Sequence, residues 1–149
     1  MMRPRVYQIK CSSDLKTLDS LLFKALVFLN ERTEPINLDV SGKSEPISGY
    51  RKFVVEEIGF GELTKDRLLL GGSVIHKRFR LTIRYKYPKG WGWSDVFMLK
   101  FHQAKEGIRV IINRVNGLGR TTPGYIIELL KTIIVRESYE SFFEVTVYE

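Results

Sequence analysis

The stretch HKRFRLTIRYKYP (76–88) gives the clearest indication of the fold, because hydrophobic and cationic side chains alternate along it. Successive side chains of an extended strand point to opposite faces. One face of the predicted strand, which begins near Ser73, carries Ile75, Phe79, Leu81, Ile83, Tyr85 and Tyr87. The other face carries His76, Arg78, Arg80, Thr82, Arg84 and Lys86. The stretch therefore predicts a strand with one buried face and one cationic face.

Two further strands are predicted directly after this one. Residues 94–103 and 107–115 are rich in aromatic and β-branched residues. The connections PKGWGW (88–93) and AKE (104–106) are short, as in β-hairpins. We therefore expect residues 73–115 to form an antiparallel meander of three strands.

In the part of the chain before the meander, the spacing of hydrophobic residues changes from that of a strand to that of a helix. RVYQIKC (5–11) alternates like a short strand, whereas residues 12–32 carry leucines at the three- and four-residue spacing of a helix face. Ser12 or Ser13 is the expected N-cap of this helix, with Asp14 in its first turn. Residues 33–50 read as loop with at most a short strand at 36–40, and residues 51–60 are a further strand candidate.

After the meander, NGLGRTTPG (116–124) marks a stop and a new start. Thr121 or Thr122 is the expected cap, and Pro123 suits the first helical turn. An apolar helix face follows at Ile126, Leu129, Leu130, Ile133 and Ile134. Residues 138–149 fit either a final strand or an extension of this helix. Strands grouped between two helices predict the α+β class, with helices on one face of an antiparallel sheet.

Composition is that of a folded protein with an uneven charge. The 149 residues fit one domain, and 44% hydrophobic with 28% charged residues exclude a disordered chain. No apolar run is long enough to span a bilayer, and the first residues lack a secretory signal. The single Cys11 forms no internal disulfide, so we expect a cytoplasmic protein; abundant Lys, Arg and Glu are typical of thermophiles.

The net charge of +7 comes from one segment. Between Arg67 and Ser94 there are seven cations and no acid, and elsewhere cations and acids balance. A charge so concentrated needs its own explanation, because a row of like charges repels itself.

The order of elements resembles that of the START-like helix-grip superfamily, also called SRPBCC. The residues that carry the resemblance are RVYQIKCSSDLKTLDSLL (5–22) and GLGRTTPGYIIELLKTII (117–134). The resemblance implies a curved antiparallel sheet packed around a C-terminal helix, with an N-terminal strand-helix unit. It also implies that apolar or lipid-like ligands bind between the sheet and that helix. The family has no universal catalytic residue that would transfer to this chain.

The first functional hypothesis follows from this resemblance. We expect non-enzymatic binding of a small apolar or amphipathic ligand, with no cofactor and no metal. Tyr85 or a loop group would fix the polar end of the ligand, and Trp91 would border the mouth of the cavity. The predicted lining consists of Phe53, Phe79, Leu81, Ile83, Tyr85, Trp91, Phe97, Leu99, Ile126, Leu130 and Ile133.

The alternative hypothesis is a basic nucleic-acid-binding module, or a surface for anionic lipid headgroups. Phosphates would contact the cationic strand face, at Arg78, Arg80, Arg84 and Lys86. The aromatics of the same strand point the other way, which argues against a stacking surface. A third interpretation is an ordinary solvated face, with acids such as Glu56 or Glu57 opposite the cations.

Sequence motifs for catalysis are weak. His76 and His102 lack a third metal ligand at a zinc-site spacing, and Cys11 has no histidine near it in sequence. Glu57 becomes the best single candidate for chemistry if it points inward beside Phe53 and Val55. An enzyme of the polyketide-cyclase kind would need inward polar groups that the sequence does not identify.

Overall fold

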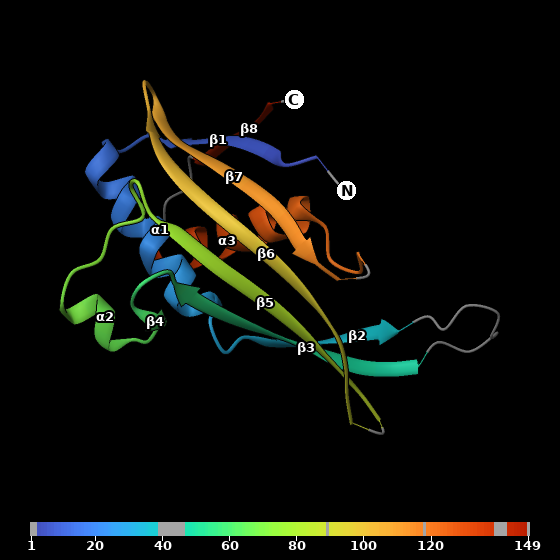
Figure 1. The fold of residues 1–149 in the computed structure, drawn as a ribbon. Coiled ribbons are helices and arrows are strands. Elements are labelled where there is room, and N and C mark those ends of the chain that lie inside the picture. The colour runs from blue at the N-terminus through green and yellow to red at the C-terminus, as the bar shows by residue number, and fades with distance from the viewer. Residues whose placement is uncertain (1–2, 39–46, 89, 118, 139–142, 149) are drawn as a thin grey trace.

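Figure 1 shows the fold in a computed structural model, which describes residues 3–38, 47–88, 90–117, 119–138 and 143–148. The elements are β1 (Arg5–Cys11), α1 (Leu15–Leu29), β2 (Thr33–Leu38), β3 (Ile47–Glu57), β4 (Gly61–Glu62), α2 (Asp66–Leu69), β5 (Arg78–Tyr87), β6 (Gly90–Ala104), β7 (Gly107–Asn116), α3 (Pro123–Ser138) and β8 (Phe143–Tyr148). The predicted α+β class is confirmed.

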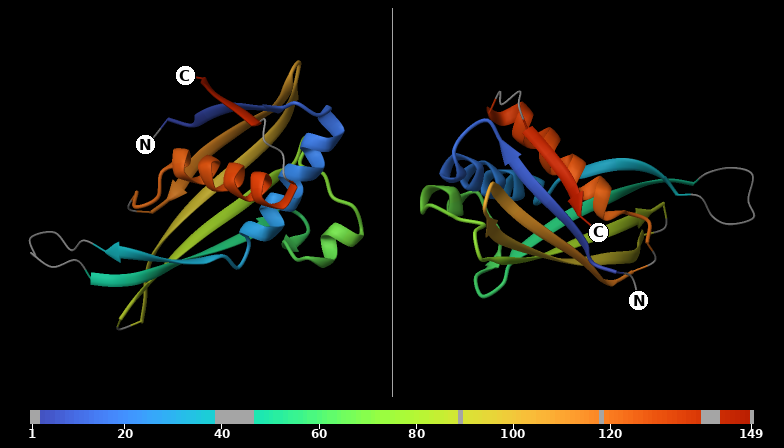
Figure 2. Two further views of the ribbon diagram at one scale, coloured as in Figure 1. Left: turned by 180° about the vertical axis from the view of Figure 1, so that it is seen from behind. Right: turned by 90° about the horizontal axis from the view of Figure 1, so that it is seen from above.

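The strands form one antiparallel sheet in the order β2-β3-β5-β6-β7-β1-β8, with β4 paired to β3. The predicted meander of β5, β6 and β7 is therefore confirmed. The N-terminal strand β1 lies between β7 and β8, so strands that are far apart in the sequence are neighbours in the sheet. Figure 2 shows the sheet curling, with α1 and α3 on its concave side. We call this the inner face and the opposite, convex side the outer face.

Helix α1 forms where the leucine spacing predicts it, but its cap differs from the prediction. Asp14, not Ser12 or Ser13, is the N-cap, and its carboxylate accepts a hydrogen bond of 2.8 Å from the backbone N–H of Thr17. This bond lowers the pKa of Asp14 below its ordinary value. The apolar stripe of α1 is buried in the core at Leu18, Leu22, Phe23, Ala25, Leu26, Val27 and Leu29.

Helix α3 begins at Pro123, as predicted, and Thr122 rather than Thr121 provides the side-chain cap. The Thr122 hydroxyl accepts a hydrogen bond from the N–H of Tyr125. The apolar face of α3 is buried at Ile126, Ile127, Leu129, Leu130, Ile133 and Ile134. Both helices and the inner face of the sheet share one hydrophobic core, in which Phe23 of α1 meets Phe79 of β5 edge to face at 6.4 Å.

Several strand boundaries differ from the sequence prediction. Strand β5 begins at Arg78 rather than Ser73, because the Asp19 carboxylate on α1 binds the Ser73 hydroxyl and the backbone N–H groups of Val74 and Ile75. The chain then turns at His76, whose φ of 58° is incompatible with a strand.

Strand β2 spans Thr33–Leu38 rather than residues 36–40, whose last part lies outside the described residues. It tolerates Pro35 because it is an edge strand of the sheet.

The C-terminal alternative is settled for residues 143–148, which form β8 and pair with β1. Residues 139–142 lie outside the described residues. In the described part of the chain, no helix has the length and apolar character needed to cross a membrane. The curled sheet with a C-terminal helix on its concave side is compatible with a helix-grip fold.

Candidate functional site

Alternation along β5 sorts its side chains as predicted. Phe79, Leu81, Ile83 and Tyr85 are buried in the core, whereas Arg78, Arg80, Arg84 and Lys86 are exposed on the outer face. Neighbouring strands add cations to that face: Lys52 of β3 is in register with Arg84, and Lys100 of β6 is in register with Arg78. We call these six residues, which span three adjacent strands, the outer basic face: Lys52, Arg78, Arg80, Arg84, Lys86 and Lys100.

Acids are scarce beside these cations. Glu56 is the one acid among the outward side chains in the described parts of β3, β5, β6 and β7. It lies opposite Arg80 in the register and forms a half-exposed ion pair with it at 3.4 Å. Glu57 points inward instead. The interpretation as an ordinary solvated face, with acids opposite the cations, thus holds at Arg80 alone among the described residues.

Aromatic side chains of the neighbouring strands share the outer face, although those of β5 point inward as predicted. Tyr50 of β3, Lys86 of β5 and Trp91 of β6 lie in one row across three strands. Arg84 and Lys86 contact the Trp91 ring, with their charged groups 4.5 and 5.7 Å from its centroid. The prediction considered the aromatics of β5 alone and missed those that the adjacent strands supply.

A β-bulge in β6 explains why both Trp91 and Trp93 lie on the outer face. The register between β5 and β6 shifts between Arg84 and Lys86, so that β6 holds one extra residue there. Gly92 faces the ring of Tyr87, which packs against the core, and a Cβ at Gly92 would lie 1.9 Å from that ring. Because Gly92 points toward the inner face, its neighbours Trp91 and Trp93 point to the outer face, and the extra residue of the bulge lets Trp93 and Ser94 share that face.

The side chains predicted to line a ligand cavity lie together on the inner face, with one exception. Phe53, Phe79, Leu81, Ile83, Phe97, Leu99 and Ile126 are fully buried, and Tyr85, Leu130 and Ile133 are at most 5% exposed. They form one packed cluster between the sheet and α3. Trp91 does not join them, because it lies on the outer face, 47% exposed.

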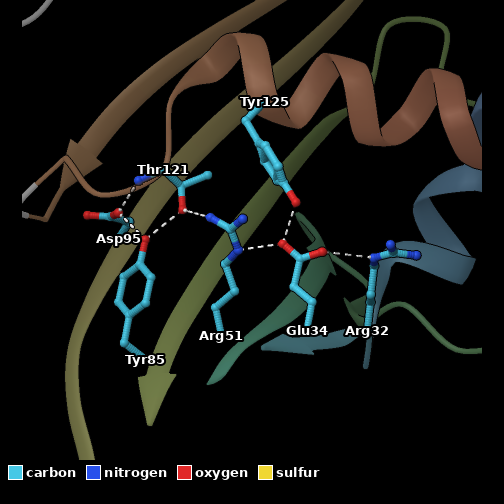
Figure 3. A network of polar contacts seen from close by, with 7 residues as sticks. All are labelled: Arg32, Glu34, Arg51, Tyr85, Asp95, Thr121 and Tyr125. Carbon is cyan, nitrogen blue, oxygen red and sulfur yellow. Dashed lines mark hydrogen bonds and ion pairs between the residues drawn. The ribbon is translucent and has the colours of Figure 1, made fainter. Parts of the chain in front are cut away.

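A polar network, part of which is drawn in Figure 3, lies at the end of this core where α3 begins. Its centre is the fully buried carboxylate of Asp95 on β6. Asp95 accepts hydrogen bonds from the Tyr85 hydroxyl at 2.6 Å and from the backbone N–H groups of Gly119 and Thr121. Arg114 forms an ion pair with Asp95 at 3.2 Å and donates to the Thr121 carbonyl. The network thus ties three strands, β5, β6 and β7, to the loop that leads into α3.

A second arm of the network reaches the edge of the sheet. The Glu34 carboxylate on β2 pairs with Arg51 of β3 and with Arg32, and it accepts a hydrogen bond from the Tyr125 hydroxyl on α3. Arg51 also stacks over the Tyr125 ring at 4.1 Å and donates to the Thr121 hydroxyl, which joins the two arms. Figure 3 shows these side chains linked in one chain of contacts.

The hydrogen bonds of this network hold the strands and α3 together. Burial, together with the hydrogen bond to Asp95, raises the pKa of Tyr85 above its ordinary value, so its hydroxyl stays protonated and donates. Burial and the bond to Glu34 raise the pKa of Tyr125 in the same way. Each tyrosine is a neutral donor to a carboxylate, and the network supplies the inward polar groups that the sequence did not identify.

Glu57 is buried on the inner face beside Phe53 and Val55, as its place in β3 predicts. Arg67 of α2 donates to its carboxylate at 2.9 Å, and the Lys77 ammonium lies 3.9 Å away. Both cations also stack on the exposed Phe60 ring. This cluster fastens the 58–77 segment to the sheet.

Other candidates from the sequence do not assemble into a site. The rings of His76 and His102 meet at 6.2 Å, but the described residues contain no group of three or more metal-ligating side chains. Cys11 borders a cleft of about 430 Å³ at the start of α1, and a second cleft of about 560 Å³ lies between the end of α1 and residues 63–66.

Comparison with known proteins gives no relative: no family model, no curated protein and no solved structure matches this chain. The candidate site therefore rests on its own geometry.

Proposed function

We propose that this protein binds nucleic acid through the outer basic face. The observation that carries the proposal is the charge on three adjacent strands: among their described residues, six cations share one face with a single acid, Glu56. The charge excess of the whole sequence falls in the segment that contains β5. This concentration favours a polyanionic partner over a surface that is merely solvated.

Electrostatics supplies the driving force for such binding. Lys86 and Arg84 are two residues apart on one strand, so their side chains emerge about 6.6 Å from each other. Like charges at this spacing repel, and bound phosphates relieve the repulsion while releasing condensed counterions. Among the described residues no carboxylate pairs with Arg78, Arg84, Lys86, Lys52 or Lys100, so these groups are available to phosphates.

The test is charge reversal at the centre of the face. The double variant Arg84→Glu/Lys86→Glu is compared with Lys16→Glu/Arg136→Glu, which makes the same change in net charge at exposed positions on α1 and α3. We expect wild-type affinity for a labelled oligonucleotide to fall steeply with added salt. The first variant should lose about a hundredfold or more in affinity, and the control should lose severalfold at most. Equal losses in both variants would contradict the proposal.

A second candidate function is the binding of an apolar or amphipathic ligand, favoured by the curled sheet that encloses α3. The ligand would lie among Phe79, Leu81, Ile83, Phe97, Leu99 and α3, where burial contributes about 25 cal/mol per Å² of apolar surface. Because these side chains are packed against one another, entry requires α3 to move from the sheet. Native mass spectrometry of protein purified from cells tests this candidate, which predicts a co-purified apolar compound.

A further inference from the structure

The outer basic face carries three large aromatic side chains that the core does not use. Tyr50 is 53% exposed, Trp91 47% and Trp93 62%. Exposed aromatic side chains that gather on one face often mark a contact site, and these three lie on or beside the same three strands as the cations. The bulge in β6 brings both tryptophans to that face.

We infer that the nucleic acid bound by this face is single-stranded, with bases stacked on Trp91, Trp93 and Tyr50 beside the phosphate-binding cations. The inference rests on the proposed function and narrows it to one class of nucleic acid. Aromatic rings gain stacking energy from unpaired bases, whereas the bases of a duplex are already stacked on each other. Cations alone would serve either form.

Shape supports the same conclusion. The outer face is the convex side of the curled sheet, and α1 and α3 occupy the concave side (Figure 2). A duplex is itself a stiff convex cylinder, so it would touch a convex sheet over a small area. A flexible single strand follows the curve and keeps its phosphates on successive cations of β5, whose spacing of about 6.6 Å suits an extended backbone.

The contacts around Trp91 leave room for a base. The Arg84 guanidinium lies 4.5 Å from the ring centroid and the Lys86 ammonium 5.7 Å, yet almost half of the residue remains exposed. A base that stacks on the open part of the ring would form a layered contact with the indole and the cation behind it. The same cations remain within reach of the adjoining phosphates.

The experiment uses intrinsic fluorescence, because Trp91 and Trp93 are the two tryptophans of the sequence. Wild-type protein is titrated with a single-stranded oligonucleotide, the same sequence as a duplex, heparin, and vesicles of anionic lipid. We expect the single strand to quench the tryptophan emission and to bind about tenfold or more tighter than the duplex. Heparin should bind without quenching the tryptophan emission, since its anionic groups can contact the cations of the protein but it has no base to stack on the tryptophans.

Variants separate stacking from charge. Trp91→Leu should lower single-strand affinity about tenfold and leave heparin retention unchanged. Phe60→Leu is the matched control, because Phe60 is an aromatic side chain as exposed as Trp93 and lies away from this face, in the turn between β3 and β4; its affinity should equal wild type.

Two results would overturn the inference while leaving the proposed function intact: duplex binding as tight as single-strand binding, or undiminished single-strand affinity in Trp91→Leu. Failure to bind either nucleic acid would sink the proposed function itself. Binding to the anionic vesicles alone would assign the face to lipid headgroups and overturn both.

Discussion

The cationic side chains on the two faces of this sheet differ in their partners. On the inner face, Arg114 and Arg51 are largely buried, and each is paired with a carboxylate, Asp95 or Glu34. On the outer face, Arg84 and Lys86 contact an aromatic ring and have no carboxylate partner among the described residues. The comparison separates two roles for positive charge. The inner cations hold the fold together, and the outer ones are available to an external anion.

The largest effect on stability should come from breaking an ion pair of the inner face. Asp95→Asn keeps the size of the side chain but removes the charge that faces Arg114 in a buried site. We expect the free energy of unfolding to fall by about 3 kcal/mol, because the guanidinium loses its counterion. Urea unfolding measures this loss, and the folded variant should keep its affinity for nucleic acid. A loss below about 1 kcal/mol would show that Asp95 is not the centre of this polar network.

Alkaline pH should weaken the same region. Tyr85 has a raised pKa because it is buried, with the hydrogen bond to Asp95 as a further cause. In the unfolded chain a tyrosine ionises near its ordinary value of 10.0, whereas folded Tyr85 keeps its proton. Its contribution to stability is therefore complete below about pH 10 and is lost as the pH rises further.

Unfolding measured between pH 9 and 12 should give a slope of up to about 1.4 kcal/mol per pH unit from this one group. Tyr85→Phe should make the slope shallower. Part of it should remain, since burial also raises the pKa of Tyr7. An unchanged slope in Tyr85→Phe would contradict the assignment.

A smaller effect on stability is expected at the bulge in β6. The added methyl of Gly92→Ala would overlap the ring of Tyr87, so either that ring or the strand must shift. We expect a loss of about 1–2 kcal/mol in stability and a severalfold loss in single-strand affinity, since Trp91 and Trp93 flank the glycine. Gly124→Ala is the control, because its new Cβ meets atoms only at 3.9 Å or beyond. Wild-type oligonucleotide affinity in Gly92→Ala would show that tryptophan placement is unimportant.

The smallest effect is expected from the one outer acid. Glu56→Gln removes a half-exposed ion pair with Arg80, which contributes less than about 1 kcal/mol to stability. Affinity for nucleic acid should rise severalfold, because Arg80 is released and a repulsive charge is lost. Anisotropy titrations at two salt concentrations measure the gain. Weaker binding by this variant would indicate that Glu56 positions Arg80 for the ligand.

The sequence predicted the faces of the strands better than their connections. Alternation identified the inward and outward residues of β5 because a period of two is a direct consequence of strand geometry. The start of β5 was missed, since the Asp19 carboxylate that holds residues 73–75 comes from a helix more than 50 positions earlier.

Part of the polar network was within reach of the sequence. Asp95 and Arg51 each stand two residues before a core phenylalanine, Phe97 or Phe53, so alternation alone places them inward. Glu34 carries no such signal in its loop-like segment. The bulge in β6 was also beyond prediction, because it depends on how two strands match in register rather than on either strand alone.

We propose that nucleic acid lies on the outer face of β3, β5 and β6, and photo-crosslinking locates the bound strand. A single-stranded oligonucleotide carrying 5-iodouracil is irradiated with the wild-type protein, and the crosslinked peptides are sequenced by mass spectrometry. We predict adducts on Tyr50, Trp91 or Trp93, and their loss in Arg84→Glu/Lys86→Glu. Adducts confined to α1 or α3, on the opposite side of the sheet, would contradict the account.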